Sequence, residues 1–358
     1  MTEPTSDPPL VTRPDPPADA SAPEVPARPR PGFREAVLWC AVFVAVQMTG
    51  AVVTVAGVFA AYAAASPEPG KFVDEQLSGF TKALDPKGEG ERVAMPFEFG
   101  QARAWGMPAA QFAALGLIAL VLPRRIGPDW KRQIGFRAPH PLHVLLVLLL
   151  VPGFMIASDL IQTVFLWLTG MKPPSALKAV NGVFGRFPWP LTVLAVALGP
   201  GVVEELWCRG FVGRGLLARY GAAAGVLLTA GLFAAMHLDP SQLVVITCMG
   251  AYLHFVYLAT RSIWAPVLLH AANNAVAILI ALVFKPGDGQ GNVEVPVIVY
   301  VVTLALVLFG SVALWTSRAE PDAPGDARPR YGAVSPAALL FTFVSFGALA
   351  VLAARFAR

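Results

Sequence analysis

The feature that most constrains this chain is a series of apolar runs, each close to the length needed to cross a bilayer. About 20 apolar residues in a helix span the hydrocarbon core of a membrane. The candidate runs lie at 36–64, 104–123, 142–169, 190–217, 222–238, 242–260, 263–284, 295–316 and 335–355. The sequence therefore predicts an all-α fold, a polytopic transmembrane helix bundle of about 8–9 spans.

Composition agrees with this interpretation and excludes other classes. Of the 358 residues, 56% are hydrophobic and 14% are charged, against about 25% charged in an ordinary soluble domain. Mean hydropathy is +0.60. The net charge is +4, but the basic residues fall in short loops between apolar runs, so we expect the lipid bilayer and no nucleic acid as a partner.

The chain divides into four parts by composition. Residues 1–33 are rich in proline and alanine and predict a disordered tail. Residues 34–189 hold the first membrane helices, with an acidic external loop at 65–103, and 285–358 hold the last ones. The segment 190–284 between them carries most of the polar residues found inside apolar runs. The Lys/Arg bias of the short loops predicts a multi-pass protein of the cell membrane with a cytoplasmic N-terminus.

Two adjacent carboxylates stand out in the fourth run. An ionisable side chain at the bilayer centre costs about 2.5–3.5 kcal/mol on insertion scales and usually marks a site. Glu205 and Arg209 are four residues apart, so they share a helix face and can form an ion pair. Glu204 points about 100° away, because successive residues of a helix are rotated by that angle. It is left without a local partner and is a candidate general base.

Two further polar positions complete the candidate site. His237 follows Phe233 by four residues, and His270 precedes Asn274 by four, so each pair shares a helix face. We expect the chain to turn near Arg219–Gly221. Glu204 lies 16 residues before Tyr220, and His237 lies 17 residues after it. In an antiparallel hairpin they then reach the same depth, so we expect Glu204, His237, His270 and Asn274 to converge.

The remaining polar side chains have simpler interpretations. We interpret His254 as hydrogen-bonded to a neighbouring helix, Cys208 as small apolar filler, and Asp159 as helix packing. His140 and His143 are expected in a solvated loop. The three cysteines lie in apolar runs without a CxxC motif, which argues against a disulfide framework or a thiolate zinc site.

These residues resemble the three motifs of the CPBP intramembrane proteases, the CAAX prenyl endopeptidase and bacteriocin-processing group also called the Abi family. The motif residues are Glu204-Glu205-x-x-x-Arg209, Phe233-x-x-x-His237 and His270-x-x-x-Asn274, with Trp264-Ala265-Pro266 ahead of the last. The resemblance covers about residues 190–284. It marks that segment as a CPBP-type catalytic core.

The resemblance implies an integral-membrane endopeptidase. Glu204 with His237 would activate a water, His270 and Asn274 would stabilise the oxyanion, and Glu205 and Arg209 would support the helix. The resemblance implies that no cofactor is required. The residues alone leave a metalloprotease open, since Glu204, His237 and His270 could hold a zinc ion, although His-Glu-x-x-His is absent.

The substrate would be a prenylated C-terminal motif, a signalling or bacteriocin-like peptide, or another membrane-anchored protein. A composition rich in alanine, proline and arginine suggests a bacterial source, which favours peptide maturation. Two other functions compete. One is a non-catalytic scaffold or bacteriocin-immunity-like protein, and the other is a transporter with Asp159 and the histidines as a proton relay.

Overall fold

The computed structural model describes residues 31–84, 97–172, 188–284, 295–320 and 330–356. Within these ranges the chain is helical, and the only β pairing among them is an isolated bridge between Ala319 and Tyr331. Seven helical stretches are long and apolar enough to cross a membrane, and a shorter apolar one covers Trp264–Ile280. The prediction of a polytopic all-α bundle is confirmed.

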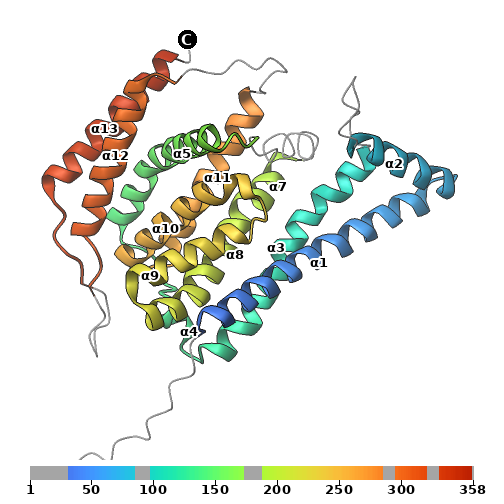
Figure 1. Ribbon diagram of the computed structural model, residues 1–358, viewed down its shortest axis with the longest axis horizontal. Coiled ribbons are helices and arrows are strands. Elements are labelled where there is room, and N and C mark those ends of the chain that lie inside the picture. The colour runs from blue at the N-terminus through green and yellow to red at the C-terminus, as the bar shows by residue number, and fades with distance from the viewer. Residues whose placement is uncertain (1–30, 85–96, 173–187, 285–294, 321–329, 357–358) are drawn as a thin grey trace, which may run out of the picture.

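The helices follow the predicted apolar runs closely. In chain order they are α1 (Phe33–Ala65), α2 (Pro69–Leu84), α3 (Phe97–Arg125), α4 (Trp130–Gln133), α5 (Pro141–Thr169), α7 (Trp189–Val193), η1 (Leu194–Leu198), α8 (Gly199–Glu205), η2 (Leu206–Val212), α9 (Gly213–Ala235), η3 (Pro240–Gln242), α10 (Leu243–Thr260), α11 (Trp264–Phe284), α12 (Val297–Thr316) and α13 (Pro336–Phe356). In Figure 1, α1 and α3 form one side of the bundle, α12 and α13 form the other, and α8 to α11 lie between them.

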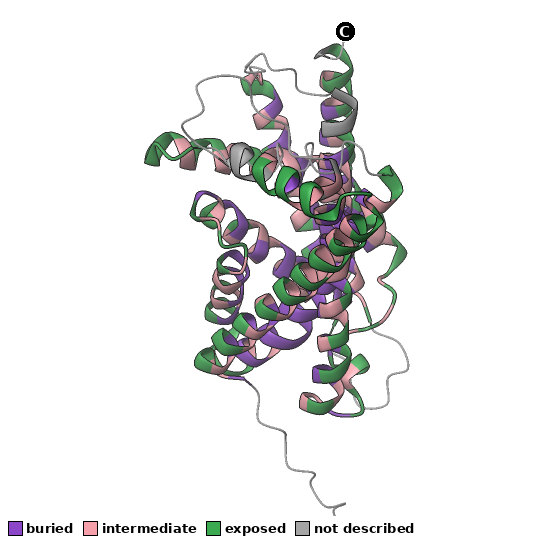
Figure 2. Cartoon of the chain, turned by 90° about the vertical axis from the view of Figure 1, so that its right-hand side faces the viewer, coloured by how far each residue is buried: buried purple, intermediate pink, exposed green. Residues whose placement is uncertain are grey.

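The outer face of the bundle is apolar. Buried residues gather where helices meet, while the outward faces carry the exposed ones (Figure 2). Large apolar side chains are among those exposed, including Val53, Trp167 and Leu227. Such a surface is costly in water and is typical of helices that face lipid.

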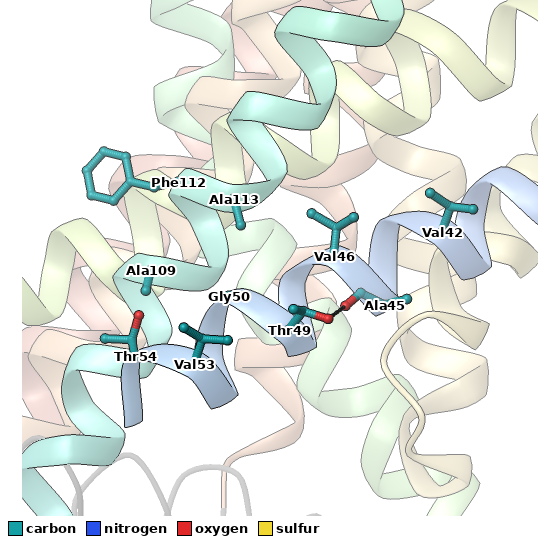
Figure 3. Close-up of a pocket in the computed structure, with 10 residues that line it drawn as sticks. All are labelled: Val42, Ala45, Val46, Thr49, Gly50, Val53, Thr54, Ala109, Phe112 and Ala113. Atoms are coloured by element: carbon teal, nitrogen blue, oxygen red, sulfur yellow. Dashed lines mark hydrogen bonds between the residues drawn. The ribbon is translucent and has the colours of Figure 1, made fainter. Parts of the chain in front are cut away.

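Small residues let α1 and α3 approach closely. A Cβ added at Gly50 would lie 2.7 Å from the Cβ of Ala113 and 3.1 Å from the carbonyl oxygen of Ala109. Beside this contact lies a shallow apolar groove of about 680 Å³, which includes Val46 and Phe112 (Figure 3). Small residues at a helix crossing are a common packing solution in membranes. The lining of this groove contains none of the candidate site residues.

The central segment is a helical hairpin. Helix continues from Trp189 to Ala235 except at Gly221, whose φ of 81° and ψ of 173° reverse the chain. This break lies where the sequence places the turn. The backbone N–H of Phe33 donates to the Tyr220 hydroxyl at 3.2 Å, so the beginning of α1 lies beside the turn.

The segment 65–103, expected as an acidic external loop, contains the helix α2 and the first residues of α3 among its described residues. α2 packs on α1 through Phe72, whose ring centroid lies 5.7 Å from that of Phe59. Gln76 also donates to Glu98 at 2.9 Å. An amphipathic helix carries too many charges to register as a membrane span. Most of the expected tail, residues 1–30, lies outside the described residues.

Gly221→Ala should destabilise the fold by about 1–3 kcal/mol, because its backbone conformation is essentially restricted to glycine. No neighbouring atom lies within 4 Å of a Cβ at this position, so the cost comes from the backbone alone. Thermal unfolding in detergent measures it. Gly231→Ala is the matched control, since a Cβ there also meets nothing within 4 Å and the residue is helical. Equal unfolding of the two variants would contradict the assignment.

Candidate intramembrane site

The helix that carries Glu204 and Glu205 is short and has wide turns on both sides. α8 ends at Glu205, preceded by the π-helical segment η1 and followed by the π-helical segment η2. Single π-type turns inside α-helices often occur at functional sites, because they change which side chains face inward. These wide turns change how the helix is rotated on either side of Glu204 and Glu205.

A close helix crossing brings α8 beside α11. A Cβ added at Gly201 would lie 2.9 Å from the Cβ of Ala271 and 3.1 Å from its backbone nitrogen. Glycine is required at this position because the neighbouring atoms include backbone, which cannot move aside. Gly201 lies three residues before Glu204, and Ala271 follows His270. The crossing therefore places the Glu205 carboxylate next to His270.

Glu205 is the centre of a buried network. Arg209 donates through Nη1 to Glu205 Oε1 at 2.8 Å and through Nη2 to the Gly250 carbonyl oxygen at 2.6 Å. His270 Nδ1 lies 3.0 Å from the same Glu205 oxygen. Glu205 and Arg209 are fully buried. The predicted Glu205–Arg209 pair is confirmed, and the contact with His270 adds a third helix that local spacing could not reveal.

Glu204 stands outside this network. It is half-buried, and its Oε2 is enclosed by protein without a hydrogen-bond partner among the described residues. Glu205 Oε2 and Arg209 Nε share that property, but their residues are neutralised by each other. Glu204 thus differs from Glu205 in that no ion pair or hydrogen bond to its carboxylate is found in the part of the chain that the structure describes.

His237 lies at the end of the hairpin's second arm. Its Nδ1 is 2.9 Å from the Phe233 carbonyl oxygen. A carbonyl can only accept, so Nδ1 carries the hydrogen and Nε2 of the neutral ring has a lone pair. His237 is exposed. Leu238, which follows, has a φ of 56°, a left-handed conformation that is strained for a branched side chain and ends the helical path.

The Phe233 ring connects the histidines with the network. Its centroid lies 5.0 Å from that of His237 and 6.1 Å from that of His270, both nearly edge-on. The Arg209 guanidinium carbon lies 5.0 Å from the same ring. The structure thus brings His237, His270 and Arg209, from three separate helices, around one phenyl ring.

Asn274 is oriented by two hydrogen bonds. Its Nδ2 donates to the Val196 carbonyl oxygen in η1 at 3.3 Å, and its Oδ1 accepts from Asn273 Nδ2 at 3.4 Å. A side-chain amide has two N–H donors. One of them therefore stays available beside the turn of α11 that carries His270.

A capped turn after His237 adds polar residues that the sequence interpretation missed. Asp239 accepts from the Ser241 hydroxyl at 2.7 Å and from the Gln242 amide at 2.9 Å. These two hydrogen bonds hold the pKa of the Asp239 carboxyl below its ordinary value. Gln162 of α5 donates to the Ser241 carbonyl oxygen at 2.8 Å. The Asp-Pro-Ser sequence is a helix-start signal that could have indicated this turn.

A catalytic zinc site needs three protein ligands close together, with a fourth position for water. Among the described residues, no group of three or more His, Cys, Asp and Glu side chains is placed to hold a metal ion. His270 directs Nδ1 to Glu205, which leaves Nε2 as the ring nitrogen that could bind a metal, and a carboxylate partner of this kind is common for metal-ligating histidines.

Other residues singled out from the sequence have varied surroundings. His143 is not solvated as expected but fully buried, with Nε2 2.8 Å from the Ser317 carbonyl oxygen, because α5 begins at Pro141 and carries it into the bundle. His254 is buried, yet neither ring nitrogen has a partner among the described residues, so the expected hydrogen bond is absent there. Cys208 is buried, whereas His140 and Asp159 are exposed.

The fold defines a multi-pass membrane protein, and the candidate polar site draws its residues from α8, the end of α9 and α11. Residues 186–276 match the family described as type II CAAX prenyl endopeptidase Rce1-like. This segment is therefore similar to that family, in agreement with the resemblance to the CPBP proteases.

One curated relative supports the same assignment. The chain is 25% identical over 207 residues to a protein of Bacillus subtilis (strain 168) named "Putative membrane peptidase YdiL", which covers 53% of this chain and 82% of the relative. No solved structure matches this chain significantly.

Arg209→Met should lower the free energy of unfolding by about 3–5 kcal/mol, because it leaves the buried Glu205 charge without its main partner. Thermal unfolding of the purified chain in detergent measures the loss. The control is Arg124→Met, at an exposed arginine where we expect a change within about 0.5 kcal/mol. If both variants unfolded like the wild-type chain, Arg209 would not stabilise the bundle.

Proposed function

We propose that this chain is an integral-membrane endopeptidase that hydrolyses a peptide bond with a water activated by Glu204 and His237. The observation that carries the proposal is the arrangement around Phe233, where His237 and His270 flank one ring beside the helix end that bears Glu204. The Rce1-like match over 186–276 and the membrane-peptidase relative support a protease as the class.

In the proposed reaction, Glu204 removes a proton from the water while the water oxygen bonds to the scissile carbonyl carbon. His237 orients the water, because Nδ1–H is held by the Phe233 carbonyl and Nε2 can accept a hydrogen bond. The proton then passes from Glu204 to the departing nitrogen as the C–N bond breaks. The products are a carboxylic acid and an amine, which exchange a proton to become a carboxylate and an ammonium group.

The oxyanion would be stabilised from α11. His270 is held through Nδ1 by Glu205, which leaves Nε2 as the nitrogen that can face substrate. A carboxylate in that position stabilises an imidazolium, so that Nε2–H can donate. The second N–H of Asn274 would supply another donor. Each such donor is typically worth about 10²–10³ in rate. Glu205 and Arg209 would act as positioning residues.

The substrate we propose is a membrane-bound peptide or a membrane-anchored protein. His237 is exposed and Glu204 is half-buried, while the outer helix faces are apolar. A chain presented from the bilayer can therefore reach His237 without leaving the membrane surface. The remaining proposals are a multi-pass location in a bacterial cell membrane and a cytoplasmic N-terminus.

Glu204→Gln should abolish cleavage while leaving the fold intact, because it replaces one carboxylate oxygen by an isosteric amide that cannot take up a proton. The measurement compares the N-terminal peptides of cells that express the wild-type or the variant chain at equal levels. New N-termini that disappear in the variant identify the substrate and the cleaved bond. Glu68→Gln, at an exposed residue outside the site, should leave them unchanged.

The same comparison distinguishes the non-catalytic scaffold. If Glu204→Gln and His237→Ala cells retained every N-terminal peptide of the wild type, proteolysis would be contradicted and a scaffold or immunity function would take its place. Uptake of a solute by liposomes that contain the chain would instead support transport.

Cleavage should persist after treatment with a zinc chelator, since the proposed reaction requires no cofactor. Among the described residues no three His, Cys, Asp or Glu side chains are grouped to hold a metal ion, and a carboxylate with a histidine can activate water without one. The measurement is the cleavage rate of the identified substrate by purified chain before and after 1,10-phenanthroline. Loss of activity that added Zn²⁺ restores would contradict the expectation and establish a metal-dependent reaction.

A further inference from the structure

We propose that a cavity at the α4–α9–α10 end of the bundle binds the phosphate-bearing headgroup of an anionic phospholipid. The cavity has a volume of about 670 Å³, and its charged lining residues are Arg132, Arg137, Arg214, Arg261 and Asp129. Nothing in the proposed hydrolytic reaction uses these residues. Arg214 lies ten residues from Glu204, or about 15 Å along a helix.

The cavity has a rigid frame. The segments around Gly135 and Arg261 are tied together, since Ile263 N–H donates to the Gly135 carbonyl at 2.9 Å and Arg137 Nε donates to the Arg261 carbonyl at 3.2 Å. Gly135 and Arg261 both have positive φ values, of 64° and 49°. A Cβ at Gly135 would collide with the Arg261 carbonyl oxygen, so only glycine permits this approach.

The charge of the lining selects an anion. The lining contains four arginines and one carboxylate, that of Asp129. The arginines come from separate elements: the α4 region, α9 and the end of α10. Arg214 is fixed by its hydrogen bond to Gln133 Oε1 at 2.6 Å. Arginine presents planar N–H donors that suit phosphate oxygens. Topology alone explains why basic residues lie at one end of a membrane bundle, but it does not require four of them to line one cavity.

The uncharged part of the lining points to a lipid. Leu217, Ala218, Leu258 and Tyr257 complete the wall, and the Tyr257 hydroxyl donates to the Ile134 carbonyl at 3.2 Å. A basic cavity beside apolar side chains at the end of membrane helices matches the known form of a headgroup site. In Figure 1 this end holds α4, the α9 turn and the beginning of α1.

The test measures the thermal unfolding midpoint of the full chain in neutral detergent during titration with phosphatidylglycerol. We expect a saturable rise that phosphatidylcholine does not produce. For Arg132→Gln/Arg261→Gln, the half-saturating concentration should increase about twenty-five-fold, because each arginine near a charged headgroup contributes about a fivefold factor. The single variant Arg132→Gln should raise the half-saturating concentration about fivefold, and it replaces the double variant in the test if that variant fails to fold.

The matched control is Arg124→Gln/Arg318→Gln, which removes two arginines that do not line the cavity and should titrate like the wild type. Equal titration of the cavity variant and the wild type, or equal effects of the two lipids, would overturn the proposal. Inorganic phosphate and glycerol 3-phosphate form a separate arm. If either compound saturated the chain at the concentration that phosphatidylglycerol requires, the lipid would be contradicted as the ligand and the cavity would be assigned to free phosphate.

Discussion

The interaction on which this structure depends is the hydrogen bonding of one buried carboxylate. Glu205 Oε1 receives Arg209 from its own helical segment at 2.8 Å and contacts His270 of α11 at 3.0 Å. Arg209 in turn holds the Gly250 carbonyl of α10. In a membrane interior, no water replaces these partners, so unpaired groups would be far more costly than in a soluble protein. The network therefore fixes how three helical segments are rotated relative to one another.

This arrangement gives two adjacent glutamates different surroundings. Glu205 is the last residue of α8 and points into the network, whereas Glu204 is half-buried and lies outside it. The wide turns of η1 and η2 and the glycine crossing at Gly201 make the separation possible. In the proposed reaction, Glu205 supports the helices through its ion pair with Arg209, and Glu204 acts as the base. The residue that stabilises the bundle and the residue proposed to act on water are therefore different ones.

The sequence predicted the membrane helices and the hairpin well, because both depend on local properties. Apolar run length sets the spans, and glycine at position 221 marks the turn. It predicted the Glu205–Arg209 pair from helical spacing for the same reason. It missed the contact of His270 with Glu205 and the burial of His143, since both depend on the rotation of distant helices. It also missed α2, whose mixed polarity hides it from a search for apolar runs.

A double-mutant cycle determines whether Glu205 acts on the proposed reaction through His270. Cleavage of a membrane substrate by Glu205→Gln, His270→Ala and the double variant would be measured in liposomes, per folded molecule. We expect Glu205→Gln to slow the wild-type reaction roughly a hundredfold but to change nothing further once His270 is alanine. If Glu205→Gln cost the same factor in both backgrounds, the two residues would act independently and the proposed positioning role of Glu205 would be contradicted.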